Sequence, residues 1–262
     1  MAVNNKPMPN IKEFYILGRP IKTDIGILYP VKVRDYPDFL EHMQILTFDK
    51  AIIIKWLQDL LKKQIPQEAK KSIIDLLEYI KETPLFDLTL TLKGEQYGQL
   101  GLILDEVYKG YRKLFQFCFK EDVIDKIKNN DEFQSYIELI YSFNGMKYDK
   151  PSPNPRINQR NKIKQMIQQA QGENISLESI VTSVSVSTKK DVNNMTLYEL
   201  YKTFDRIGQF KNYERTVLYS IFSSDIKIDP WYKAIEHKDE QSFITEQQLQ
   251  KAREQKGLHE KM

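Results

Sequence analysis

Three histidines and one cysteine are the residue types in this chain best suited to metal binding or nucleophilic catalysis. His42, His237 and His259 are widely separated, and the sequence contains no HExxH pattern, no Cys/His cluster and no GxSxG pattern. A zinc site needs several such ligands at short spacing, and a serine hydrolase needs its nucleophile in a tight turn between strand and helix. The sequence therefore predicts no catalytic residue, no metal site and no cofactor, and we expect a protein that is not an enzyme.

The single cysteine, Cys118, lies between aromatic residues in RKLFQFCFKED. A reactive thiol needs electropositive neighbours that stabilise the thiolate, whereas a cysteine among apolar residues is usually a small buried side chain. The buried interpretation is favoured here. One cysteine cannot form an intrachain disulfide, which fits a reducing compartment.

Two weaker patterns invite a nucleotide or nuclease interpretation. Gly94, Gly98 and Gly101 lie between a predicted strand and a helix, but their spacing is neither GxGxxG nor GxxxxGK[ST], so a turn is favoured over a phosphate loop. Pro37-Asp38 and Glu68-Ala69-Lys70 loosely match the PD…ExK outline of magnesium-dependent nucleases. That nuclease fold needs strands, whereas here the first pair opens one helix and the second group lies in the first turn of another.

A basic cluster follows a proline-rich stretch and suggests nucleic acid as an alternative ligand. Lys150, Arg156, Arg160, Lys162 and Lys164 lie within KPSPNPRINQRNKIK, and the last four are the candidate phosphate contacts. The net charge of only +3, from 39 basic and 36 acidic residues, does not indicate a nucleic-acid protein. A solvated linker is the favoured interpretation, and nucleic-acid binding stays open as the alternative.

The composition is that of a globular protein. The 262 residues are 41% hydrophobic and 29% charged, which suits one large or two smaller folded domains. The first residues lack an apolar signal core, and no apolar run approaches the roughly 20 residues that cross a bilayer. We expect a protein without a membrane association that stays inside the cell that makes it.

The periodicity of apolar residues predicts a mainly α fold with minor β structure and a helical bundle-like architecture. A small hairpin is expected between Ile11 and Val33, with its turn at Gly-Arg-Pro, and a strand is expected at Leu85–Leu92, where Leu and Thr alternate. Asp35 is expected to cap a helix that carries Pro37 in its first turn. Further helices are expected at 48–63, 67–82, 98–119, from 131, at about 155–171, at about 176–186 and within 193–222.

Proline content marks the expected domain boundary. Pro151, Pro153 and Pro155 forbid a regular helix and favour extended backbone. We predict an N-terminal β-hairpin plus helical domain at 1–149, a Pro-rich basic linker at 150–162, a C-terminal helical module at 163–235 and a charged tail at 236–262.

The C-terminal module contains the clearest helix start of the chain. Thr196 and Glu199 match a capping box, in which the threonine hydroxyl accepts a hydrogen bond from the third backbone N–H of the helix. Leu197, Leu200, Phe204 and Ile207 follow at spacings of three and four. Such a stripe most often packs into its own domain. The aromatic content of the region is nevertheless typical of interfaces, and the candidate partner-binding residues are Tyr198, Tyr201, Phe204, Ile207, Trp231 and Tyr232.

Four segments of this region, NPRINQRNKIKQMIQQAQ, SLESIVTSVSV, DVNNMTLYELYKTFDRIGQFKNYE and SSDIKIDPWYKAI, resemble tailed-bacteriophage proteins. The resemblance covers roughly Phe133 to Ile235 and is most specific at Met195–Ile207. It is a resemblance to tail assembly chaperones and neighbouring tail-morphogenesis proteins.

The resemblance implies a helical protein without an active site that binds other phage structural or tail proteins, such as the tape measure or tail-tube components. It also implies action in the host cytoplasm. Three alternatives stay open: a structural component of the tail or baseplate that is retained in the virion, self-association into a homo-oligomer, and the nucleic-acid-binding protein described above.

Overall fold

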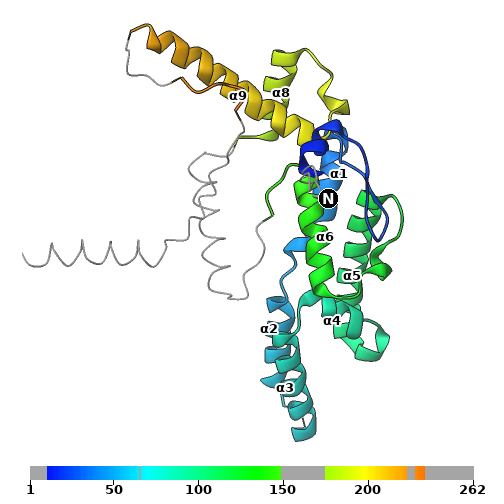
Figure 1. Cartoon of the computed structure of the whole chain (residues 1–262). Helices are drawn as coiled ribbons and strands as arrows, with labels where there is room; N and C mark the ends of the chain where they lie inside the picture. The colour runs from blue at the N-terminus through cyan, green and yellow to red at the C-terminus, as the bar shows by residue number, and fades with distance from the viewer. Residues whose placement is uncertain (1–10, 65, 149–174, 223–227, 234–262) are drawn as a thin grey trace, which may run out of the picture. The chain divides into compact units, whose positions relative to one another are not determined.

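The computed structural model describes residues 11–64, 66–148, 175–222 and 228–233 (Figure 1). It is mainly α-helical and contains a two-stranded antiparallel sheet near the N-terminus, so the predicted fold class is confirmed. The chain divides into two compact units, Met1–Ile207 and Gly208–Met262. The predicted linker at 150–162, the helix predicted at about 155–171 and the predicted tail at 236–262 lie outside the described residues.

The N-terminal hairpin is present but begins later than the sequence predicts. Residues from η1 (Ile11–Leu17) form a 3-10 helix in place of the expected first strand, and the hairpin joins β1 (Ile21–Lys22) to β2 (Ile27–Leu28). Gly18 closes the 3-10 helix with φ of +61° and an N–H that donates to the Tyr15 carbonyl. The hairpin turn lies at Thr23–Gly26, not at Gly-Arg-Pro, because the Thr23 N–H and hydroxyl both donate to the Gly26 carbonyl.

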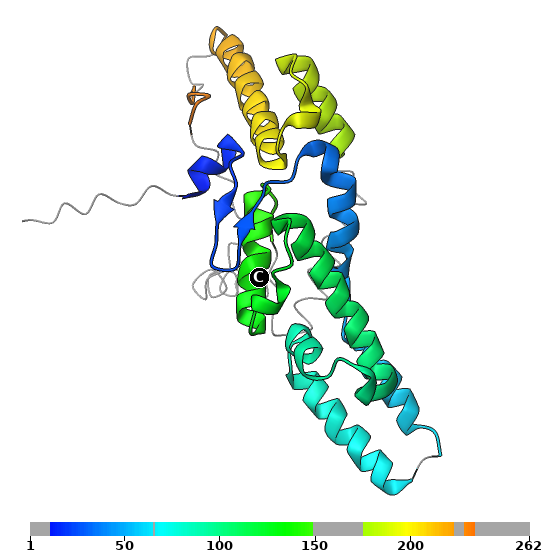
Figure 2. The same cartoon turned by 90° about the vertical axis from the view of Figure 1, so that its right-hand side faces the viewer.

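One short helix follows the hairpin, and the two helices after it form an antiparallel pair. After η2 (Val33–Asp35), helix α1 (Tyr36–Met43) carries Pro37 in its first turn, as predicted. Asp35 stands at the N-cap position, but its carboxylate lies 3.6 Å from Arg34 and makes no capping hydrogen bond, so the predicted side-chain cap is wrong. η3 (Gln44–Thr47) leads to α2 (Ala51–Leu61) and α3 (Gln67–Glu82), which run side by side (Figure 2). Ile53 and Leu57 of α2 and Leu77 and Ile80 of α3 are buried between them and the next two helices.

The strand predicted at Leu85–Leu92 is wrong, because the segment forms helix α4 (Leu85–Thr91). Pro84 precedes the first turn, where its missing N–H costs nothing. The Thr89 and Thr91 hydroxyls donate to the Phe86 and Asp87 carbonyls one turn back, so both hydroxyls have hydrogen-bond partners within the helix. The alternating Leu and Thr pattern also places leucines four residues apart, so it fits a helical face as well as a strand.

Helix α5 (Gly98–Phe119), which follows η4 (Glu95–Tyr97), is the centre of the first unit and packs on α1, α4 and η5 (Ile124–Lys126). Helix α6 (Asn130–Phe143) is capped by the Asn129 side chain, which accepts from the Glu132 N–H at 2.9 Å. Rings join these helices: Phe133 of α6 lies 4.3 Å from Phe86 and 4.8 Å from Tyr111, centre to centre. These rings belong to the main core, the largest cluster of buried apolar side chains.

The C-terminal part of the first unit shares that main core. It comprises α8 (Leu177–Thr188), η6 (Val192–Asn194) and the start of α9 (Leu197–Ser220), whose second half belongs to the second unit. The Thr196 hydroxyl accepts from the Glu199 N–H at 3.1 Å, which confirms the predicted cap of α9. Buried side chains from this part complete the core: Ile180, Val184, Val192, Met195, Leu197 and Leu200.

Candidate protein-binding surface

The glycines that suggested a phosphate loop have structural roles. Gly94 and Gly98 have φ of +108° and +56°, which non-glycine residues rarely adopt. A Cβ on Gly101 would lie 1.9 Å from the Gly94 carbonyl oxygen. The three glycines therefore build the tight entry into α5, as the turn interpretation predicts.

The other residues with catalytic potential also have structural surroundings. Cys118 is buried, as predicted, and burial raises the pKa of its thiol to about 12. His42 packs against the Phe117 ring at 5.2 Å, whereas His237 and His259 lie outside the described residues. Pro37-Asp38 and Glu68 are in first turns of helices. Within the described ranges no three His, Cys, Asp or Glu side chains are grouped so that they could hold a metal ion.

A charged cluster on α5 holds the loop that follows this helix. The Arg112 Nη2 and the Tyr108 hydroxyl donate to the two carboxylate oxygens of Asp125 at 2.7 and 2.6 Å. Burial, and then the Asp125 carboxylate, raise the pKa of Tyr108 to about 12. The hydrogen bond from Tyr108, together with the Arg112 charge, lowers the pKa of Asp125. The Arg112 Nε also lies 3.4 Å from the Asp122 carboxylate, so the cluster joins the residues that follow α5, including η5, to this helix.

Four of the predicted partner-binding residues contact their own unit. Tyr198, Tyr201, Phe204 and Ile207 are partly buried against the main core. The Tyr198 ring meets Tyr15 edge-on at 5.6 Å, and burial followed by the neighbouring Tyr36 raises the pKa of Tyr201. The α9 backbone comes so close to Gly145 that a Cβ there would lie 3.2 Å from the Tyr198 Cα. This stripe therefore serves packing within the first unit.

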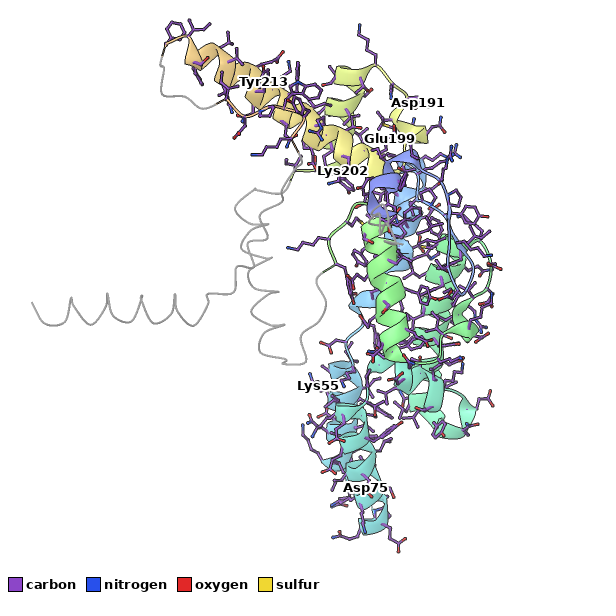
Figure 3. The ribbon with its side chains drawn as sticks, viewed as in Figure 1. Lys55, Asp75, Asp191, Glu199, Lys202 and Tyr213 are labelled. Carbon is purple, nitrogen blue, oxygen red and sulfur yellow. The ribbon has the colours of Figure 1, made fainter. Side chains whose placement is uncertain are left out.

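The second half of α9 and the segment 228–233 carry a different surface, shown in part in Figure 3 around Tyr213. None of the described residues of this second unit is buried. Near the end of α9, Leu218 is 60% exposed, Ile221 72% and Phe222 88%. Ile221 and Phe222 follow the last residue of α9 in a turn, where their N–H groups donate to the Leu218 and Tyr219 carbonyls. These exposed side chains therefore lie within five consecutive residues that also include exposed Tyr219. We call these four residues the terminal patch.

Both remaining candidates, Trp231 and Tyr232, also lie in the second unit. Trp231 meets the Phe210 ring edge-on at 5.6 Å and is 39% exposed, whereas Tyr232 is 71% exposed. The polar groups nearby interact locally, since Lys211 pairs with Glu214 at 2.8 Å. Apolar surface is thus left accessible. The four candidate phosphate contacts, Arg156, Arg160, Lys162 and Lys164, lie outside the described residues.

The terminal patch was not among the partner-binding residues expected from the sequence. Beyond Ile207 the apolar residues of α9 continue through Phe210, Tyr213, Val217 and Ile221 at spacings of three and four. The pattern therefore does not show where the covered part of the stripe ends. Contacts in the folded chain show that only its first part reaches the core of the first unit.

Comparison with known proteins places the chain in a family. Residues 9–153 match the family model described as the YomV N-terminal domain, and residues 167–236 match the YomV second domain. The chain is 24% identical over 240 residues to the "SPbeta prophage-derived uncharacterized protein YomV" of Bacillus subtilis (strain 168), covering 90% of this chain and 93% of that protein.

The phage resemblance is confirmed in its coarser form, since that relative is prophage-derived. No solved structure matches the chain. None of the described helices combines the length and the apolar character of a membrane span. Because the first family model alone covers more than half of the residues, this chain belongs to the YomV family.

Proposed function

We propose that this protein acts in the assembly of a phage particle by binding another phage protein, without catalysing a reaction. In its specific form, the proposal is a tail assembly chaperone that binds tape-measure or tail-tube components. The prophage-derived relative supports the phage context. The tail assignment rests on the sequence resemblance centred on Met195–Ile207.

The observation that carries the proposal is the exposure of the terminal patch. Soluble monomers rarely leave large apolar groups together on their surface unless the groups bind something. The described part of the second unit buries no residue of its own, so it does not hide this patch in a core. Burial of apolar surface contributes about 25 cal/mol per Å² and needs no catalytic group. Such a surface suits a chaperone, which covers an apolar segment of its partner until assembly buries that segment elsewhere.

The test is affinity purification of the full-length protein from cells that produce the phage. Leu218→Asp combined with Phe222→Asp should remove the phage proteins that co-purify with the wild type, because each change places a charge in the contact. Both side chains are exposed, so the free energy of unfolding should change by only about 0.5 kcal/mol or less.

A matched control places the same charge on a different exposed leucine. Leu102 on α5 is 53% exposed, and Leu102→Asp should leave partner binding intact. Equal loss in both variants, or retention in both, contradicts the proposal. Comparison with purified virions then separates a chaperone, which is absent from the particle, from a retained structural component.

Salt dependence separates this proposal from the nucleic-acid alternative. Apolar binding should change little between about 50 and 200 mM salt, whereas each phosphate contact adds a salt slope of roughly 0.9. Replacement of Arg156, Arg160, Lys162 and Lys164 by Gln should therefore leave the protein partner bound. Tight DNA binding at physiological salt that this variant loses would favour the alternative.

A further inference from the structure

Helices α2 and α3 form an antiparallel hairpin within the first unit, and we call these two helices the arm (Figure 2). The apolar residues of α2 extend around the helix from Ile52 through Ile53 to Ile54, an arc of about 200° at 3.6 residues per turn. A helix at the surface of a globular protein usually carries a stripe about half as wide. The arm therefore contains more apolar residues than one buried face requires.

The folded chain leaves part of this apolar surface exposed. Ile53 and Leu57 are the buried residues of α2, and they lie in a smaller core shared with α3, α4 and α5. Trp56 packs against the same core and is half-buried. Ile52 is 59% exposed, and Ile74 on α3 is 47% exposed. Both helices of the arm thus keep an apolar side chain that is accessible to another molecule.

The charged side chains of the arm point away from this smaller core. Lys55 on α2 and Asp75 on α3 are both exposed (Figure 3). Lys55 lies two residues before buried Leu57, and Asp75 lies two residues before buried Leu77. Two residues turn a helix by about 200°, so each charge lies opposite the buried side of its helix. Within the described residues neither side chain forms an ion pair.

The two charges lie at the same level along the arm. Lys50, which precedes α2, donates to carbonyls within residues 80–83 at the end of α3. Both helices rise about 1.5 Å per residue in opposite directions. Lys55, five residues after Lys50, is therefore level with a point about five residues before 80–83, between Asp75 and Glu78. One arm thus presents a cation on α2 and a carboxylate on α3 at equal height.

This arrangement is complementary to itself. A two-fold axis parallel to the arm places α2 of one molecule on α3 of another and leaves the levels along the helices unchanged. Each Lys55 then meets Asp75 of the other molecule, and the pair occurs twice. Such isologous contacts are the commonest in homo-oligomers. The charge pattern therefore points to a second copy of the chain as the molecule that covers the arm.

We infer that two copies of this protein associate through their arms into a four-helix contact, with α2 of each copy against α3 of the other. The exposed apolar side chains of the arms lie in the contact, and the two Lys55–Asp75 pairs lie at its rim. An apolar centre with a charged rim is the usual anatomy of protein interfaces. The association uses neither the terminal patch nor its partner and goes beyond the proposed chaperone activity.

Charge reversal in two separate proteins tests the association by sedimentation velocity. The full-length wild type should rise from the 31.0 kDa of one chain toward twice this mass between about 5 and 500 µM protein. Lys55→Glu and Asp75→Lys should each weaken the dimer at least about tenfold, because each dimer then holds two like-charge contacts. An equimolar mixture of the two variants should regain the wild-type affinity, because every contact between different variants joins opposite charges.

Matched variants separate this contact from other effects. Lys113→Glu reverses an exposed lysine on α5 and should leave the dimer unchanged. Ile52→Asp combined with Ile74→Asp should abolish it, whereas Leu102→Asp should not. Circular dichroism checks that each variant keeps its helices.

Three results overturn the inference. The first is a wild type that stays monomeric at about 500 µM, and the second is a mixture of Lys55→Glu and Asp75→Lys that associates no better than either variant alone. The third is loss of the dimer in Leu218→Asp/Phe222→Asp, which would assign self-association to the terminal patch. Because that variant should dimerise normally while it loses phage proteins, the two proposals fail separately.

Discussion

At the scale of single residues, Lys50 shows how one charged side chain can cap the C-terminus of one helix and connect it to the start of another. Its ammonium donates to the carbonyls of Ile80, Lys81 and Thr83 at 3.1, 2.7 and 3.1 Å. The last carbonyls of a helix lack partners within it, and the negative end of the helix dipole favours a cation there. The pKa of Lys50 is lowered, because burial disfavours the charged ammonium more than nearby Asp49 favours it. Lys50 thus fastens the start of α2 to the end of α3, while Lys55 on the same helix is exposed (Figure 3).

Cys118 yields a prediction that reports on the integrity of the main core. Its thiol should react with a thiol reagent at pH 8 at least about a thousandfold more slowly in the folded protein than in denaturant, because the reaction requires opening of the core. A Lys190→Cys variant supplies an exposed thiol as the fast control. Rapid modification of Cys118 in the folded wild type would show that α5 is not packed as described.

The same thiol makes stability depend on pH. The raised pKa of Cys118 means that above pH about 9 the unfolded chain loses a proton that the folded chain keeps. Burial raises the pKa of Tyr148 to about 12 as well, and Tyr108 shares this value. The free energy of unfolding should therefore be unaffected by these groups at pH 8 and fall as the pH rises from about 9 toward 12. Urea titrations at pH 8 and 10.5 measure the difference.

At the scale of elements, glycines in two helices have opposite surroundings. Gly101 lies in the first turn of α5, where a Cβ would collide with the Gly94 carbonyl, whereas Gly208 lies inside α9 with nothing within 4 Å of the Cβ position. A glycine within a helix costs backbone entropy on folding without adding side-chain contacts. The close backbone contact in the first turn of α5 therefore requires a glycine at position 101, whereas no contact in α9 requires one at position 208.

The expected result is that Gly208→Ala raises the free energy of unfolding by about 0.5–1 kcal/mol, because alanine restricts the unfolded chain and fits the open space. Gly101→Ala should lower it by about 1–3 kcal/mol, because the backbone entering α5 must shift. Thermal unfolding followed by circular dichroism measures both. A loss of stability in Gly208→Ala would mean that α9 does not continue through this residue.

At the scale of the whole molecule, sequence domains and structural units do not coincide. The family models separate residues 9–153 from 167–236. The contacts within the folded chain instead define two compact units, Met1–Ile207 and Gly208–Met262. The reason is the main core, which takes buried residues from α8, η6 and the start of α9 as well as from the N-terminal helices. The second domain is thus divided between a packed part and an exposed part.

Limited proteolysis tests this arrangement. Cleavage of the native protein should begin within Lys150–Lys162, the predicted linker, and give an N-terminal fragment of about 150 residues, because exposed connecting segments are cut first. The fragments should then elute together in size-exclusion chromatography, since Leu197 and Leu200 remain in the main core. First cuts inside α5 or α6 would contradict the boundary, and separate elution would contradict the shared core.

Several elements follow from the sequence alone because their signals are local. The predicted helices 67–82 and 98–119 agree with α3 and α5, since apolar periodicity and flanking Pro or Gly residues mark them. The cap at Thr196 follows from a four-residue pattern. The strand predicted at Leu85–Leu92 failed because its pattern fits both periods, and burial against α5 and α6 decided in favour of a helix.

The sequence by itself determined two features, namely that it lacks the catalytic motifs considered above and that α9 carries an apolar stripe. Only the tertiary structure decided which part of that stripe is covered. Tyr198 and Tyr201 meet the N-terminal part of the first unit, and their neighbours across the contact, Tyr15 and Tyr36, are far away in the sequence. Leu218 and Phe222 remain exposed although their residue types suit a core equally well. Apolar periodicity shows that a helix has a face to bury, but contacts between distant segments determine whether the chain itself buries it.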